Sequence, residues 1–205
     1  RPEWGSVHPD TRDVYFCCTN NSSRTVPDAA NPRTNNANGH IIRWRETGSQ
    51  AATAFTWDIY LFGAEDDAAA NVNLSGLTAE NHFSSPDGLY FDPRGLLWIQ
   101  TDDGAYTDVT NCMMLASLPG SVGDGAKKTL TYTATAGTLT VDTYVGKAPG
   151  EDKLKRFLVG PKGSEITGLC ETPDGKAMFI NIQHPGENTA QADIADPSKY
   201  QSEWP

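Results

Sequence analysis

The sequence predicts an all-β fold organised as part of a β-propeller, and three observations support this prediction. Glycine and proline are frequent, with 19 and 13 residues, and runs that favour helices are scarce. Short apolar segments alternate with turn residues, as in chains built from many short strands. One strand–turn–strand pattern recurs at intervals of roughly 80 residues, which indicates a repeated architecture.

The recurring pattern consists of an apolar segment, a turn that contains proline, and a second apolar segment. The prolines are Pro9, Pro93 and Pro173, and in the two later units Gly95 and Gly175 follow within the turn. Tight turns of this kind join antiparallel strands. We therefore expect three antiparallel hairpins, which pair residues 3–8 with 14–18, 87–91 with 96–100, and 165–170 with 177–182.

Further strand candidates lie between the hairpins, at 40–44 and 55–61 in the first unit and at 113–116 and 156–159 in the second. Each complete unit thus has four strands, as does a propeller blade. Residues 1–205 are expected to form one partial propeller domain, with units starting near residues 3, 87 and 165. Two and a half blades cannot close a ring, so we expect the rest of the chain or another chain to supply the missing blades.

Three long loops account for the excess length of the units, at 20–39, 64–82 and 119–152. The third loop contains two stretches of alternating polar and apolar residues, on either side of Ala136-Gly137. This pattern predicts an extra hairpin inserted in the second blade, on the surface and away from any metal site.

Charge and composition exclude several classes of protein. The net charge of −10 disfavours binding to nucleic-acid phosphates. No apolar run is long enough for a transmembrane helix. No signal peptide is visible, and the abrupt start at Arg1 is more typical of a processed or partial chain than of a whole gene product. The four cysteines lack zinc-ligand spacing, and we expect Cys17, Cys18, Cys112 and Cys170 to be small buried apolar residues.

An acidic residue stands near the start of the first strand in each unit: Glu3, Asp87 and Glu165. In a propeller these strands line the central channel, so the three carboxylates are predicted to converge there. Converging carboxylates repel one another unless a cation lies between them, and oxygen-rich sites suit Ca²⁺. The alternative interpretation is that these residues are ordinary turn acids.

Polar residues that follow the second strands are weaker candidates. Asn20, Asn21, Asp102 and Asp103 have side-chain oxygens that could bind calcium, although Asn and Asp also favour turns for local reasons. His184 could be a ligand or an acid–base group, or a loop histidine that holds its turn by a hydrogen bond.

Several motifs together resemble the C-terminal half of the PhoX family of alkaline phosphatases. They occur in the order expected for that family and span nearly the whole chain. The matching segments are residues 1–4, 19–22, 31–36, 39–44, 85–89, 156–161, 165–168 and 181–187.

The resemblance implies a six-bladed propeller that holds a cluster of calcium and iron ions and hydrolyses phosphate monoesters. It also implies export to the periplasm or beyond. The family's Arg-Pro-Glu element matches Arg1 and Glu3, which implies that Arg1 contacts phosphate and Glu3 binds metal. Two departures stand out. The first half of the propeller, which carries an iron-binding cysteine in the family, is absent, so no iron ligand is assigned to the cysteines of this chain. The 119–152 loop is also longer than the family pattern.

Two other functions remain open at the level of sequence. One is a lactonase-like propeller hydrolase with a single calcium ion. The other is a propeller without catalytic activity, used for binding or assembly. A binding module has no need of converging carboxylates, so the acids at the starts of the units favour an enzyme.

Overall fold

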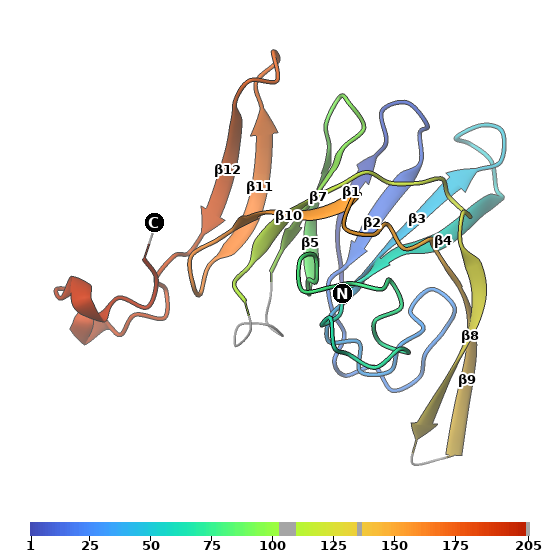
Figure 1. The fold of residues 1–205 in the computed structure, drawn as a ribbon, viewed down its shortest axis with the longest axis horizontal. Coiled ribbons are helices and arrows are strands. Elements are labelled where there is room, and N and C mark those ends of the chain that lie inside the picture. Colours follow the sequence, from blue (N-terminus) through green and yellow to red (C-terminus); the bar gives the residue numbers. More distant parts are fainter. Residues whose placement is uncertain (103–109, 135–136, 204–205) are drawn as a thin grey trace.

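The computed structural model describes residues 1–102, 110–134 and 137–203, and this part of the chain is all-β apart from two short 3-10 helices (Figure 1). The strands are β1 (Pro2–Val7), β2 (Val14–Cys18), β3 (His40–Glu46), β4 (Phe55–Phe62), β5 (Pro86–Phe91), β6 (Leu97–Thr101), β7 (Met113–Ser117), β8 (Ala126–Ala134), β9 (Gly137–Val145), β10 (Leu154–Val159), β11 (Glu165–Glu171) and β12 (Met178–Gln183). The 3-10 helices are η1 (Gln191–Asp193) and η2 (Pro197–Lys199). Neither helix is long and apolar enough to cross a membrane, among the residues described.

The strands form three sheets that follow one another across the molecule (Figure 1). The first sheet has the order β1-β2-β3-β4-β9-β8, and its first four strands are antiparallel neighbours in chain order. The second sheet has the order β10-β7-β6-β5, and the third is the β11–β12 hairpin. Sheets of six, four and two strands are not by themselves a ring, so the propeller stays a prediction.

The all-β prediction is confirmed, and so are the three antiparallel hairpins. Each of their six strands begins and ends within one residue of its predicted bounds. The further strands predicted at 40–44, 55–61, 113–116 and 156–159 are present as β3, β4, β7 and β10. The 20–39 and 64–82 segments contain no strand longer than a single bridge.

The main core lies between the first two sheets. Tyr15 and Ile41 of the first sheet pack with Leu89 and Ile99 of the second, and all four are at most 3% exposed. A second core joins the third sheet to the second through Ile166 of β11. These cores fix the three hairpins relative to one another.

The cysteines do not all behave as expected. Cys17 and Cys112 are buried and Cys18 is half-buried, but Cys170 is exposed, so the prediction is wrong for this residue. Cys170 lies on β11, which belongs to a sheet of only two strands. This small sheet does not cover both faces of its own residues.

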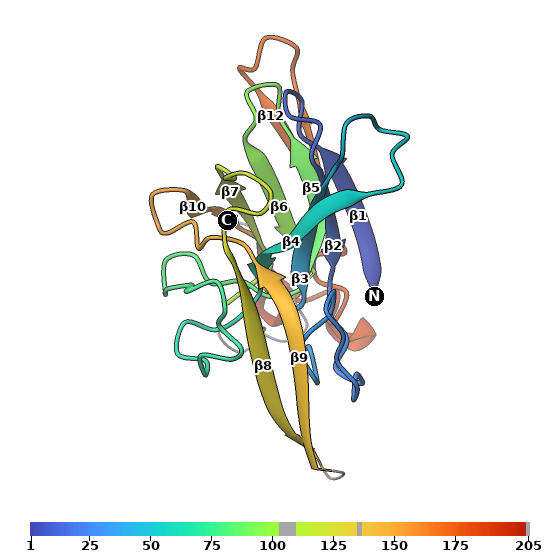
Figure 2. The same cartoon turned by 90° about the vertical axis from the view of Figure 1, so that its right-hand side faces the viewer.

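The extra hairpin is formed by β8 and β9, which pair from Ala126↔Val145 to Ala134↔Gly137. Ala136, where the turn is predicted, lies outside the described residues. In the sequence the hairpin interrupts the second sheet, but it joins the edge of the first sheet through a parallel bridge, Ile59↔Val145 (Figure 2). The hairpin is thus inserted between two strands of the second sheet, as predicted, but it pairs with the first sheet.

Apolar contacts explain this placement. Leu130 of β8 and Val145 of β9 pack with Ile59, Phe62 and Leu74, all of them at most 8% exposed. The far end of the hairpin extends away from the sheets (Figure 2). Because β1 and β8 form opposite edges of the six-stranded sheet, the hairpin is separated from the strand that carries Glu3.

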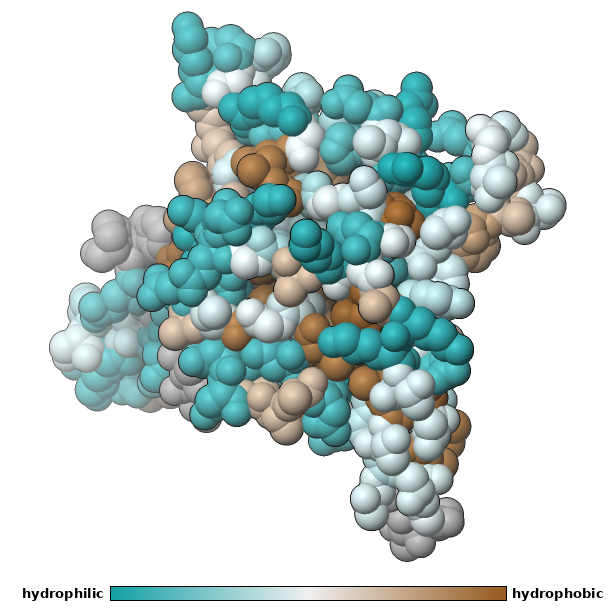
Figure 3. Space-filling model, turned by 45° about the vertical axis from the view of Figure 1, so that its right-hand side comes forward, coloured by the Kyte–Doolittle hydropathy of each residue, from teal (hydrophilic) through white to brown (hydrophobic). Residues whose placement is uncertain are grey.

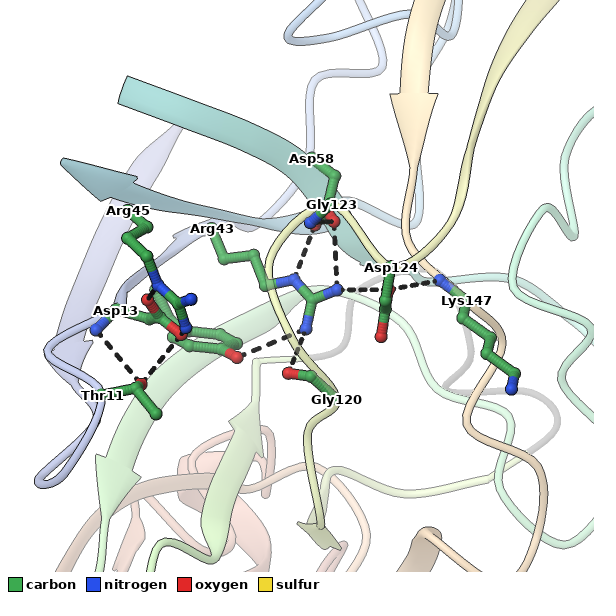
Figure 4. A network of polar contacts seen from close by, with 10 residues as sticks. Thr11, Asp13, Arg43, Arg45, Asp58, Gly120, Gly123, Asp124 and Lys147 are labelled. Atoms are coloured by element: carbon green, nitrogen blue, oxygen red, sulfur yellow. Dashed lines mark hydrogen bonds and ion pairs between the residues drawn. The ribbon is translucent and has the colours of Figure 1, made fainter. Parts of the chain in front are cut away.

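A buried arginine holds the loop that leads into this hairpin (Figure 4). Arg43 of β3 is completely buried and forms a two-pronged ion pair with Asp58 of β4, with N–O distances of 2.6 and 3.0 Å. Its guanidinium also donates to Asp124, at 2.7 Å, and to the carbonyl of Gly120, at 2.9 Å. The Gly123 amide donates to Asp58 at 2.6 Å. The loop is thus tied to the first sheet by a charged network.

We expect the far end of the hairpin to be dispensable. Replacing residues 133–138 by Asn-Gly, which favours a two-residue hairpin turn, keeps Leu130 and Val145 in place. The free energy of unfolding of the intact protein should then change by no more than about 0.5 kcal/mol, as for surface changes in general. Deleting the whole 119–152 loop should destabilise the protein strongly, because Gly120, Asp124 and Leu130 are lost. Urea unfolding measures both, and equal stability of the two deletions would contradict this view.

Candidate metal centre

The three predicted hairpins bring their open ends to the candidate site. Antiparallel pairing places the start of each first strand beside the end of its second strand. The predicted acids and the polar residues that follow the second strands therefore share one end of each hairpin. The paired positions are Pro2↔Cys18, Pro86↔Thr101 and Glu165↔Gln183.

Each hairpin also has a register shift near this end, immediately before a glycine. The shifts lie between Pro2 and Gly5, between Pro86 and Gly88, and between Ile166 and Gly168. Bulges of this kind often re-aim a side chain beside a functional site. Among these three glycines the least room is at position 88, where an added Cβ would lie 2.1 Å from the Gln100 side-chain oxygen and would displace that side chain.

The bulges refine the alignment of the three units. Glu3 and Asp87 lie inside their bulges, whereas the third bulge contains Thr167. Glu165 precedes Thr167 by two residues and so keeps the same side of the strand. Sequence reasoning did not single out Thr167, although the glycine that follows each bulge was a usable signal.

The central feature of the site is a group of three carboxylates. One oxygen from each of Asp87, Asp102 and Glu165 lies within 4.8 Å of the others, and all three residues are half-buried. They come from β5, from the residue after β6, and from the start of β11. The structure thus brings together two of the three acids predicted from the repeat, and adds Asp102, a weaker candidate.

The environment of Asp87 disfavours its negative charge. Burial, and then repulsion from Glu3, Asp102 and Glu165, raise the pKa of Asp87 to about 6, and the positive charge of Arg1 offsets this only in part. One oxygen of Asp87, Oδ1, is buried without a hydrogen-bond partner among the described residues. A cation would both neutralise the repulsion and give this oxygen a partner.

Glu165 is shifted in the same direction. Burial raises its pKa, a hydrogen bond from His184 opposes this shift, and Asp102 raises the pKa again. Asp102 thus lies close enough to Glu165 to disfavour the negative charge of Glu165, and a cation between the two carboxylates would relieve this repulsion.

Arg1 and Glu3 lie at the border of this group. The Arg1 guanidinium is 4.0 Å from Asp102 Oδ2, and the Arg1 side chain is 59% exposed. Its main chain is held by the residue that follows β2, since the Thr19 amide donates to the Arg1 carbonyl at 3.0 Å. Glu3 is exposed and lies close enough to repel Asp87. The guanidinium is therefore available for an anion next to the acids.

His184 contacts the group through Glu165. Its Nε2 is 2.8 Å from Glu165 Oε1, and its Nδ1 is 3.4 Å from Glu187. The hydrogen bond to Glu165 raises the pKa of His184. This geometry fits the hydrogen-bonded loop histidine among the interpretations of the sequence.

The other candidates contribute through their main chains. The Asn20 carbonyl accepts a hydrogen bond from the Arg1 amino group at 2.9 Å, and the Asn21 amide donates to the Asn36 carbonyl at 2.7 Å. Their roles as calcium ligands stay predictions. Asp103 lies outside the described residues.

The oxygen group fits a hard divalent cation. With Ca²⁺–oxygen bonds of about 2.3–2.6 Å, two ligands on opposite sides of the ion lie at most about 5 Å apart. The three carboxylates already satisfy this limit. Oxygen donors favour calcium over the softer transition metals, so the side chains present here suit calcium.

Comparison with known proteins identifies relatives of this chain. The family model described as alkaline phosphatase PhoX matches residues 1–186. Among solved structures, PhoX from Pseudomonas fluorescens in complex with vanadate, a transition state analogue, is similar, with 32% sequence identity and a TM-score of 0.71. The similarity covers 98% of this chain and 32% of that chain, so this chain spans about a third of the length of that relative. No curated protein matches the sequence significantly.

Proposed function

The chain belongs to the PhoX family of alkaline phosphatases, and we propose on this basis that the intact protein is a metal-dependent hydrolase of phosphate monoesters. Residues 1–205 contribute part of its metal and phosphate site. The observation that carries the proposal is the group of three carboxylates beside an exposed arginine. Cations held by the carboxylates and the positive guanidinium beside them would together bind the negative oxygens of a phosphate ester.

The residues have distinct roles in this proposal. Asp87, Asp102 and Glu165 hold calcium, with Glu3 as a further ligand at the border. Arg1 binds the phosphate oxygens, for which a planar guanidinium is well suited. Bound metal polarises the phosphoryl group and stabilises the attacking and leaving oxygens. The proposal assigns no iron ligand to the cysteines of this chain.

The same proposal extends to the architecture. The strands β1–β4 and the second sheet act as propeller blades, and the β11–β12 hairpin opens a third. Large apolar side chains remain exposed on both outer sheets, with Trp4 at 60% and Phe179 at 66%. Hydrophobic surface is also visible between hydrophilic areas in Figure 3. The missing blades, supplied by the rest of the chain or by another chain, would cover this surface. By family, the protein acts in the periplasm or outside the cell.

The decisive experiment measures metal content and hydrolysis in the purified intact protein. We expect calcium and iron by elemental analysis, hydrolysis of p-nitrophenyl phosphate, and inhibition by vanadate. Removal of the metals with a chelator should abolish hydrolysis, and adding them back should restore it. Full activity without metal would contradict the proposal. Calcium alone with lactone hydrolysis would favour the lactonase-like alternative, and a protein without metal or activity would favour a binding module.

A further inference from the structure

We propose that His184 is a positioning residue, whose Nε2–H group fixes the Glu165 carboxylate in the orientation in which it faces Asp87 and Asp102. This inference rests on the proposed function of these acids as a cation site. The hydrogen bond between His184 Nε2 and Glu165 Oε1 is 2.8 Å long. It occupies one oxygen of Glu165 and leaves the other for the cation.

The backbone of His184 supports a role for the side chain. His184 has φ +37°, in the left-handed region, which is strained for a residue other than glycine. Glycine would adopt this turn without that strain, as Gly186 does nearby at φ +78°. A histidine at a position where glycine would be less strained, together with the hydrogen bond to Glu165, favours a role for the imidazole itself.

The left-handed turn also explains how the ring reaches its partner. Glu165 is paired with Gln183, so in a regular strand these two side chains share one face and residue 184 points to the other. The strand ends at Gln183, and the turn at His184 changes the direction of the chain. We attribute the contact between His184 and Glu165 to this change.

The contacts of the ring distinguish positioning from direct metal binding. Nε2 is already engaged by Glu165, and Nδ1 faces Glu187 at 3.4 Å. Nδ1 is buried and makes no hydrogen bond among the described residues, and the carboxylate within ion-pair distance of it is that of Glu187, so the ring contacts the group of acids through Nε2 and Glu165. A hydrogen bond to a ligating carboxylate orients it and favours its ionised form, and removal of such a partner typically lowers metal affinity 10–100-fold.

The test compares variants of the intact protein after its metal has been removed. His184→Leu removes the donor, and His184→Gln keeps an N–H donor on a flexible side chain. His184→Gly also removes the donor but relieves the backbone strain, so it separates a loss of folding from a loss of the hydrogen bond. Glu187→Gln is the matched control, because Glu187 is the other carboxylate near His184 and its side chain is 52% exposed. Calcium affinity is measured by titration calorimetry, and KM and kcat are measured after reloading.

We expect His184→Leu and His184→Gly to weaken calcium binding about 10-fold or more, and His184→Gln and Glu187→Gln to stay within about 3-fold of the unchanged protein. KM for the phosphate ester should change less than kcat. Unchanged affinity in His184→Leu and His184→Gly would overturn the inference. Equal loss in His184→Gln and His184→Leu would also overturn it, because a direct ligand is then indicated. If the unchanged protein binds no calcium, the proposed function itself fails and the inference falls with it.

Discussion

Replacing Arg43 by methionine in the intact protein is expected to lower the free energy of unfolding by about 3–5 kcal/mol. The change leaves the Asp58 carboxylate, whose side chain is 2% exposed, without its counter-charge. It also removes the hydrogen bonds to Asp124 and Gly120, which hold the loop before the β8–β9 hairpin (Figure 4). A buried charge that has lost its partner costs far more than an exposed ion pair contributes.

Chemical unfolding measures this effect, and two further variants give it a scale. Arg45 lies two residues further along β3 and pairs with Asp13, but its side chain is 45% exposed, so Arg45→Met should cost clearly less than Arg43→Met. The double variant Arg43→Met with Asp58→Leu should recover much of the lost stability, because it removes both charges. If Arg43→Met and Arg45→Met unfold at the same denaturant concentration, the buried network stabilises the fold no more than the exposed ion pair does.

Arg43 also illustrates what a sequence alone does not reveal. The alternation of residues 40–46 predicts a strand, and the strand is present. Nothing in this local pattern distinguishes Arg43, which is buried, from Arg45, which is exposed. The difference arises because the loop at residues 120–124 covers Arg43 from 77 positions or more along the chain. The same reason explains why the sequence does not predict which sheet the β8–β9 hairpin joins: Leu130 packs against residues of β4.

The local features of the fold were predictable because they depend on neighbours in the sequence. Each of the three hairpins has apolar strands on both sides of a short turn, and turn chemistry together with strand periodicity determines such a unit. The repeat of this unit along the sequence, with an acidic residue near each start, then predicts the positions of Asp87 and Glu165. The sequence distinguishes Asp102 less clearly, since an aspartate after a strand is common for local reasons. Its importance appears only when β6 and β11 are placed side by side.

Asp87→Asn is the substitution expected to affect function most. It removes the charge of the central carboxylate of the proposed site while keeping its shape, and Glu3→Gln does the same at the border of the site. We expect Asp87→Asn to lower calcium content and to reduce hydrolysis by the intact protein about 100-fold or more, since a metal that stabilises phosphoryl oxygens contributes several kcal/mol. Glu3→Gln should likewise lower the metal content and abolish most of the hydrolysis. Unchanged hydrolysis in both variants would refute the assignment of these acids as metal ligands.

The pH dependence of stability gives a second readout of Asp87 that does not depend on catalysis. In the metal-free folded protein the pKa of Asp87 is about 6, above its usual value of 3.8. The folded state therefore holds this proton more tightly than the unfolded state does. This contribution to stability is complete below about pH 4 and is lost as the pH rises through 6.

Calcium should reverse that loss, because it takes the place of the proton among the acids. We therefore expect calcium to raise the unfolding temperature of the metal-depleted protein more at pH 7.5 than at pH 5. Asp87→Asn cannot ionise, so this difference between the two pH values should shrink in the variant. The measurement is thermal unfolding of both proteins, with and without calcium, at each pH. An equal calcium effect at both pH values in the unchanged protein would show that calcium does not compete with a proton for the Asp87 carboxylate. The cation would then lie elsewhere.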